Sequence, residues 1–138
     1  MTIATLGARI LLGLLFFVSG LNIMLHFIPI SPMPPSDATT FSTILMTHNY
    51  MTFVGLLQVV GGLLLLVGRF VPLALTLLAP VIVNILLFHL LIAHEGIAGG
   101  LVAALLELFL LFVYRQSFRT LLDAAPEVQL RVPGSRIP

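Results

Sequence analysis

Cysteine, lysine and tryptophan are absent from this sequence of 138 residues. Because there is no cysteine, the chain by itself can form no disulfide, no thiolate metal site and no thiol redox couple. Charge is also scarce, since 8% of the residues are charged and the formal net charge is +1. This balance gives no electrostatic bias toward nucleic acid or acidic partners.

Hydrophobic residues make up 59% of the chain, which is more than a soluble domain of this length can bury. A bilayer core of about 30 Å needs roughly 20 helical residues to cross it. Four apolar stretches come close to that length, at about residues 6–27, 50–67, 71–93 and 97–114. The sequence therefore predicts an all-α fold, an integral membrane four-helix bundle. It forms one domain over residues 1–119, followed by a tail over residues 120–138.

Prolines, glycines and polar residues separate the four stretches. A proline-rich segment over residues 29–35 ends the first helix, because proline lacks the backbone donor and clashes with the preceding turn. Prolines rather than small residues follow this stretch, so it is expected to be a retained helix and not a cleaved signal peptide. Ser36 or Asp37 is expected to cap a short surface helix through residues 41–48. Residues 68–70 and 94–96 predict the remaining two breaks.

The arginines indicate how the helices are oriented. With four spans, the amino terminus, the second turn and the carboxyl tail share one side of the membrane, and the opposite side holds Asp37, His48, His94 and Glu95. The first side holds every cationic side chain, namely Arg9, Arg69, Arg115, Arg119, Arg131 and Arg136. The positive-inside rule then predicts that both termini are cytoplasmic.

Short segments recur between the two halves of the chain. Residues 22–26 resemble residues 84–89, since each segment begins with asparagine and ends with histidine. Residues 56–58 resemble residues 105–107, each being two leucines followed by a long polar side chain. This pattern suggests two similar helical hairpins.

Each predicted helix carries a polar side chain near the middle of the membrane. These side chains are Ser19, Asn22, Gln58, Asn84 and Glu107. An ionised side chain at the bilayer centre costs roughly 2.5–3.5 kcal/mol, so we expect all five to face the bundle interior. Glycine and alanine at helical spacing beside Gln58 and Glu107 favour close helix packing there.

Two interpretations of these residues stay open. The amides can be hydrogen-bonding contacts that hold the helices together. Glu107 is different, because a neutral residue could pack there without the penalty. It is expected to be protonated or paired, and it is a candidate proton acceptor or contact for a polar ligand head group.

The histidines lie toward the side opposite the arginines. His26 and His89 could form a pair on neighbouring helices that holds a metal, a haem or a quinone oxygen. Alternatively, they are interfacial histidines that make hydrogen bonds between helices. Close ligand spacing within a helix is lacking, so the sequence predicts no metal site. It also lacks a phosphate-binding loop, a nucleophile elbow and paired carboxylates at helical spacing.

Taken together, these runs resemble the DoxX family of membrane proteins. The resemblance is carried by Arg9–Asn22 (RILLGLLFFVSGLN) and Gln58–Phe70 (QVVGGLLLLVGRF), and continues through PLAL and PVIVN to His89. It covers about residues 8–119 and implies a small four-helix protein of the bacterial inner membrane. The family is named for a quinol-oxidase association, and some members are linked to oxidative-stress or thiol-redox complexes. Members often carry glutamate where this chain has Gln58, which leaves Glu107 as the acid at mid-depth.

Three functional hypotheses follow. The first is a redox- or quinone-associated subunit that binds an amphipathic ligand within the bundle, with other membrane redox subunits as partners; it depends mostly on the resemblance. The second is a non-enzymatic scaffold or assembly factor whose polar residues meet partner helices. The third is a small-solute or proton carrier, for which four helices would need a homo-oligomer to form a path.

Overall fold

The computed structural model describes residues 1–29, 34–119 and 121–122, and within these residues it is all helical. The expected tail over residues 120–138 lies almost entirely outside the described residues. The elements in chain order are α1 (Ile3–Leu25), α2 (Asp37–Thr47), α3 (Tyr50–Val67), α4 (Val71–Phe88), a π-helical turn η1 (His89–Ala93), α5 (Ala98–Val113) and a 3-10 turn η2 (Arg115–Phe118). The all-α prediction is confirmed.

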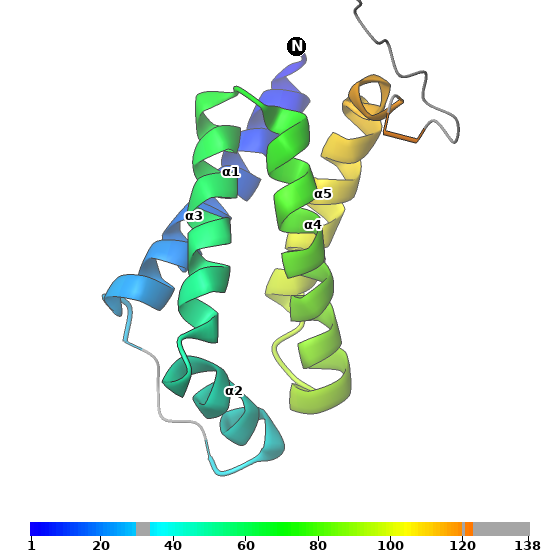
Figure 1. The fold of residues 1–138 in the computed structure, drawn as a ribbon. Helices are drawn as coiled ribbons and strands as arrows, with labels where there is room; N and C mark the ends of the chain where they lie inside the picture. Colours follow the sequence, from blue (N-terminus) through cyan, green and yellow to red (C-terminus); the bar gives the residue numbers. More distant parts are fainter. Residues whose placement is uncertain (30–33, 120, 123–138) are drawn as a thin grey trace, which may run out of the picture.

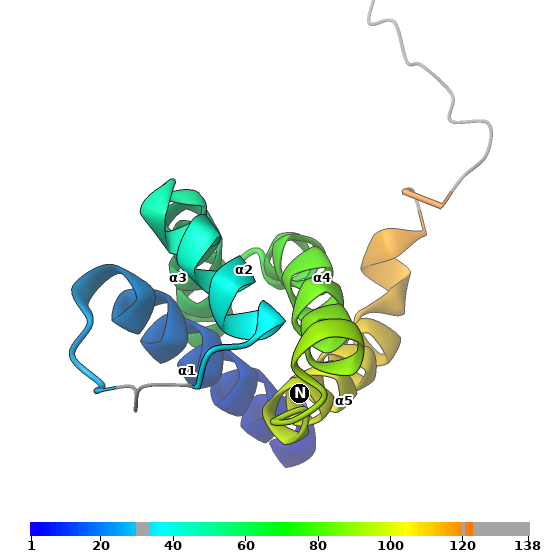
Figure 2. The same ribbon diagram turned by 90° about the horizontal axis from the view of Figure 1, so that it is seen from below.

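Four helices run alternately up and down to form the bundle (Figure 1). Seen from the end, α1 packs against α3 and α5, and α4 packs against the same two helices (Figure 2). α1 and α4 therefore occupy opposite corners, as do α3 and α5. The short helix α2 lies across one end, against α3 and η1.

Three of these helices are long and apolar enough to cross a bilayer: α1, α3 and α4 together with η1. α5 has 16 residues, or about 24 Å at 1.5 Å per residue, and is shorter than those three. Large apolar side chains cover the outside of the bundle, while Leu12, Phe16, Leu65, Leu75, Leu78 and Leu110 fill its interior. A surface this apolar fits a membrane helical bundle.

Glycines bring α1 and α3 into backbone contact. Gly13 faces Gly62 and Gly20 faces Gly55, so each helix contributes two glycines that are seven residues, or about two turns, apart. A Cβ atom on Gly20 would lie 2.6 Å from the Gly55 carbonyl oxygen. Small residues at this spacing allow membrane helices to approach closely.

Local sequence explains the helix ends. α1 starts three residues earlier than expected because the Thr2 hydroxyl accepts a hydrogen bond from the Thr5 amide at 3.2 Å. Ser36 caps α2 in the same way, with 3.2 Å to the Thr39 amide. α3 ends at Gly68, whose φ of +74° suits glycine, and a Cβ atom there would overlap the Arg9 guanidinium.

Candidate functional site

Among the residues that the structure describes, two polar side chains are buried inside the bundle with oxygen atoms that have no hydrogen-bond partner. Gln58 is 4% exposed and Glu107 is 3% exposed. Over the described part of the chain, the Gln58 Oε1 atom and both Glu107 carboxyl oxygens have no hydrogen-bond partner. Thr5 is equally buried, but it bonds to the Thr2 hydroxyl at 2.8 Å. Within the described ranges, Gln58 and Glu107 are thus the buried side chains whose oxygens are left unsatisfied.

Helical periodicity places both side chains inside. On α3 the buried positions include Gly55, Gln58 and Gly62, which share one stripe. On α5 the buried positions are Gly100, Ala103, Glu107 and Leu110, again at spacings of three and four. In both helices a glycine precedes the polar side chain on the inner face, and this allows a neighbouring helix to approach.

The two side chains lie at similar depth. A Cβ atom on Gly61 would lie 2.7 Å from Leu78, and one on Gly100 would lie 3.1 Å from Ile85. Because neighbouring helices are antiparallel, these contacts put Glu107 level with Leu78 on α4. Gln58 on α3 lies about one helical turn from that level, toward the end of the bundle that carries α2. The two groups therefore project inward at nearly the same level, from helices at opposite corners.

The surroundings of this pair are apolar. Phe16 and Leu78, each at most 1% exposed, are among the side chains that fill the interior, and Leu78 packs over Gly61, about one turn from Gln58. A buried polar group left without a hydrogen bond costs roughly 1–3 kcal/mol, and a buried unpaired charge costs more. Leucine in place of Gln58 or Glu107 would avoid that cost. The unpaired oxygens of these two buried side chains therefore mark them as the candidate site.

Three other expected site residues do not join this pair. Ser19 and Asn84 are exposed, so the expectation that they face the interior is wrong. On α4 the inner face is occupied by the row Val71, Ala74, Leu75, Leu78, Val81 and Ile82, which leaves Asn84 on the outer side. Its Nδ2 atom donates to the Pro80 carbonyl at 2.8 Å. Asn22 is half-buried at the far end of α1, where its Oδ1 atom accepts from the Ile28 amide at 2.6 Å.

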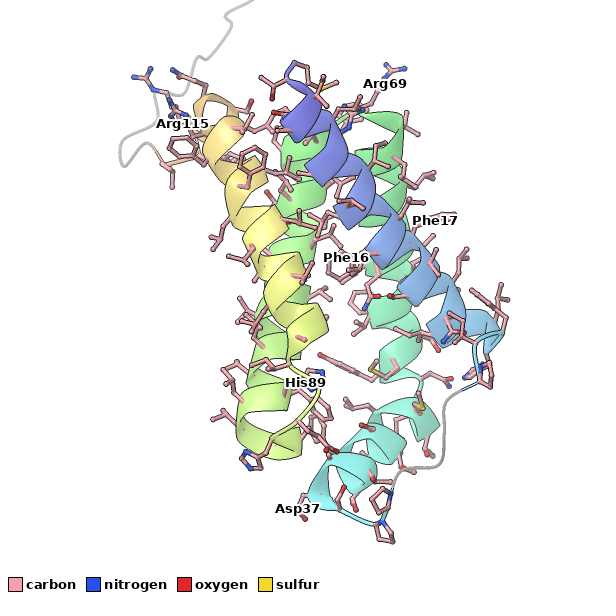
Figure 3. The ribbon with its side chains drawn as sticks, turned by 180° about the vertical axis from the view of Figure 1, so that it is seen from behind. Phe16, Phe17, Asp37, Arg69, His89 and Arg115 are labelled. Atoms are coloured by element: carbon pink, nitrogen blue, oxygen red, sulfur yellow. The ribbon has the colours of Figure 1, made fainter. Side chains whose placement is uncertain are left out.

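The structure separates the two histidines. His26 follows α1 and His89 follows α4, which are at opposite corners of the bundle. The His89 Nδ1 atom donates to the Glu95 carbonyl at 2.6 Å, and Phe88 meets the same ring edge-on. Figure 3 shows His89 toward the end that carries α2, beside the loop that leads into α5. No group of three or more metal-ligating side chains occurs within the described ranges.

A surface cavity at this end of the bundle was not expected from the sequence. It has a volume of about 360 Å³ and lies between the end of α1 and α2. Its lining consists of Asn22, His26, Ile28, Pro29, Thr39, Ser42, Thr43 and Met46. The spacing of four residues between Asn22 and His26 was the available signal, although His26 lies just past the end of α1, with a φ of +51°. The other wall comes from α2, and no local sequence pattern specifies where α2 lies relative to the end of α1.

Comparison with known proteins identifies the family of this chain. The family model described as DoxX matches residues 4–95. The chain belongs to the DoxX family. The matched residues of this DoxX-family protein cover α1 to η1 and include Gln58, whereas α5 and Glu107 lie outside the match. No curated protein and no solved structure matches the chain.

Proposed function

We propose that this DoxX-family protein is a redox-associated membrane subunit that binds the head group of a quinone-like amphipathic ligand inside its helix bundle. The observation that carries the proposal is the pair of buried side chains, Gln58 and Glu107, with three oxygen atoms left unpaired among the described residues. The unpaired atoms call for a ligand with hydrogen-bond donors.

A reduced quinone fits this chemistry. Its ring hydroxyls can donate to the Gln58 amide oxygen and the Glu107 carboxyl oxygens, while its apolar tail stays in hydrocarbon. A neutral Glu107 carboxyl could in turn donate to a quinone carbonyl. Both redox forms of such a ring would therefore find partners at the same two side chains. Asn22 and the histidines lie nearer the end of the bundle and are not part of this proposed site.

The proposal includes four membrane crossings in a bacterial inner membrane, with both termini cytoplasmic. Arg69 and Arg115 lie at one end of the bundle, and Asp37 and His89 lie toward the other (Figure 3). Arg9 lies beside the turn at Gly68, so it belongs to the same end as Arg69. The positive-inside rule supports a cytoplasmic position for this end. α5 has 16 residues, and together with Ile97 before it and Tyr114 after it this helix is proposed to complete the fourth crossing.

The test is recovery of the ligand with the protein. Wild-type protein extracted in a mild detergent should carry an amphipathic molecule near one per chain, identified by mass spectrometry of the organic extract. Gln58→Leu and Glu107→Leu should lose it. Thr76→Val is the matched control, because the Thr76 hydroxyl faces outward and donates to the Pro72 carbonyl of its own helix at 2.9 Å.

Stability gives a second readout. Glu107→Leu removes an unpaired buried acid, so it should raise the free energy of unfolding of ligand-free protein by roughly 1–3 kcal/mol while abolishing ligand retention. Wild-type protein that carries no ligand would contradict the proposal. Recovery with a stoichiometric protein partner instead would support the scaffold alternative.

A further inference from the structure

The outer face of α4 is more polar than the outer faces of its neighbours. Outward positions on α4 include Thr76, Pro80, Val83 and Asn84. The exposed side chains over the middle of α3 and α5 are all apolar: Leu56, Val60 and Leu63 on α3, and Leu101, Val102, Leu105 and Leu108 on α5. Contact with lipid explains the apolar outer faces of α3 and α5, but lipid tails provide no hydrogen-bond partner for a polar side chain.

Asn84 is the polar group on this face that needs a partner. Its Nδ2 atom donates to the Pro80 carbonyl at 2.8 Å, and Thr76 is satisfied by the Pro72 carbonyl at 2.9 Å. In the described part of the chain, no donor reaches the Asn84 Oδ1 atom. Asn84 is the fourteenth residue of an apolar helical segment of 23 residues, Val71–Ala93, and therefore lies near its middle. Water is scarce at that depth, so the exposed amide favours contact with another helix.

We propose that the outer face of α4 is the interface of a homodimer, in which Asn84 of each copy bonds to Asn84 of the other. A carboxamide carries both a donor and an acceptor, so two of them complement each other across a two-fold axis. Two copies insert in the same orientation, and the axis that relates them runs along the membrane normal. Asn84 of one copy then lies at the same membrane depth as Asn84 of the other. An unrelated helix would have a polar side chain at that depth only by coincidence.

Ser19 also faces outward, from α1, but it makes a weaker case. A serine hydroxyl can rotate to bond to a carbonyl of its own helix and needs no second helix. The larger Asn84 amide already uses its donor in that way, and its oxygen has no donor among the described residues. The dimer proposal does not depend on any ligand inside the bundle.

The absence of cysteine allows a direct test in the full chain. Val83 is 53% exposed and adjoins Asn84, so Val83→Cys should form a disulfide-linked dimer when membranes are treated with a mild oxidant. Leu56→Cys on α3 and Leu101→Cys on α5 are the matched controls, since their exposed fractions are 48% and 47%. The helix register places both near the depth of Val83. These controls should remain monomeric.

A second substitution tests the role of the amide. Adding Asn84→Leu to Val83→Cys should lower the cross-linked fraction about tenfold, as expected for the loss of two interhelical hydrogen bonds. Adding Ser19→Ala should leave it unchanged. Light scattering of wild-type protein in detergent should give twice the monomer mass of 15.0 kDa, and Asn84→Leu should shift it to monomer. Equal cross-linking at all three cysteine positions, a cross-link that survives Asn84→Leu, or a cross-link to a different protein would overturn the proposal.

Discussion

Adding one methyl group at Gly62 should weaken the bundle by separating α1 from α3. A Cβ atom at this position would lie 2.6 Å from the Phe17 amide nitrogen and 2.8 Å from the Gly13 carbonyl oxygen. Ordinary contact begins at 3.4 Å, so the two helices have to move apart by about 0.8 Å. The nearest atoms are all backbone atoms, and no side-chain rotation can relieve the overlap.

The expected size of the effect follows from two opposing terms. Overpacking of a tight interior costs typically 1–3 kcal/mol, whereas alanine favours a helix over glycine by about 1 kcal/mol. Gly62→Ala should therefore lower the free energy of unfolding by about 1–2 kcal/mol. The measurement is unfolding in mixed detergent and dodecyl sulfate micelles, followed by far-ultraviolet circular dichroism.

Two other glycines provide controls for this prediction. A Cβ atom at Gly99 would have no described atom within 4 Å, so Gly99→Ala should be neutral or slightly stabilising. Gly61 faces the flexible Leu78 side chain at 2.7 Å, so Gly61→Ala should fall between the two. If Gly62→Ala and Gly99→Ala differ by less than about 0.5 kcal/mol, the backbone contact between α1 and α3 is not what limits stability.

Three further predictions concern the ends of the helices. Gly68→Ala should lower the free energy of unfolding in detergent by about 1–2 kcal/mol, because alanine is strained at a φ of +74° and its Cβ atom would displace the Arg9 guanidinium. An unchanged melting temperature would refute this prediction. Asn22→Ala should speed hydrogen exchange of the Ile28 amide about tenfold by removing its acceptor at 2.6 Å, while Asn22→Asp should keep the protection. Ser36→Ala should destabilise α2 by about 1 kcal/mol, seen as faster exchange over its first turn, and Ser36→Asp should restore the cap.

The helices were predictable because their signals are local. Length and hydropathy define the apolar runs, and residues 29–35, 68–70 and 94–96 separate them. The cap at Ser36 follows from a side-chain oxygen that reaches an amide three residues later. These features depend on a few neighbouring residues and need no knowledge of which helix packs against which.

Which polar residues face inward was predictable only in part. Gln58 and Glu107 share a stripe with glycines, and a glycine stripe is selected by close packing. Asn84 lacks such a neighbour on its face. In a membrane protein, both the core and the lipid-facing surface are apolar, so periodicity does not separate the two sides as it does in water. The placement of Asn84 therefore depended on tertiary packing.

The two halves of the chain illustrate the limit of the repeat suggested by the sequence. Asn22 and Asn84 begin similar segments, yet they bond in opposite senses. The Asn22 oxygen accepts from an amide six residues later, whereas the Asn84 nitrogen donates to a carbonyl four residues earlier. Gly20 and Gly55 bring two backbones together, while Gly100 packs against side chains of α4. Similar segments therefore make different hydrogen bonds and packing contacts in the two hairpins.

The extent of the family match gives the proposed ligand site a sharper test. Gln58 lies within the matched residues 4–95, and Glu107 lies on a helix beyond them. If ligand retention depends on Gln58 alone, the site belongs to the part of the fold that the family model covers. If it depends on Glu107 as well, α5 of this chain helps to define which ligand is bound. Because both side chains are buried at similar depth, comparing Gln58→Leu with Glu107→Leu separates these cases with closely matched burial.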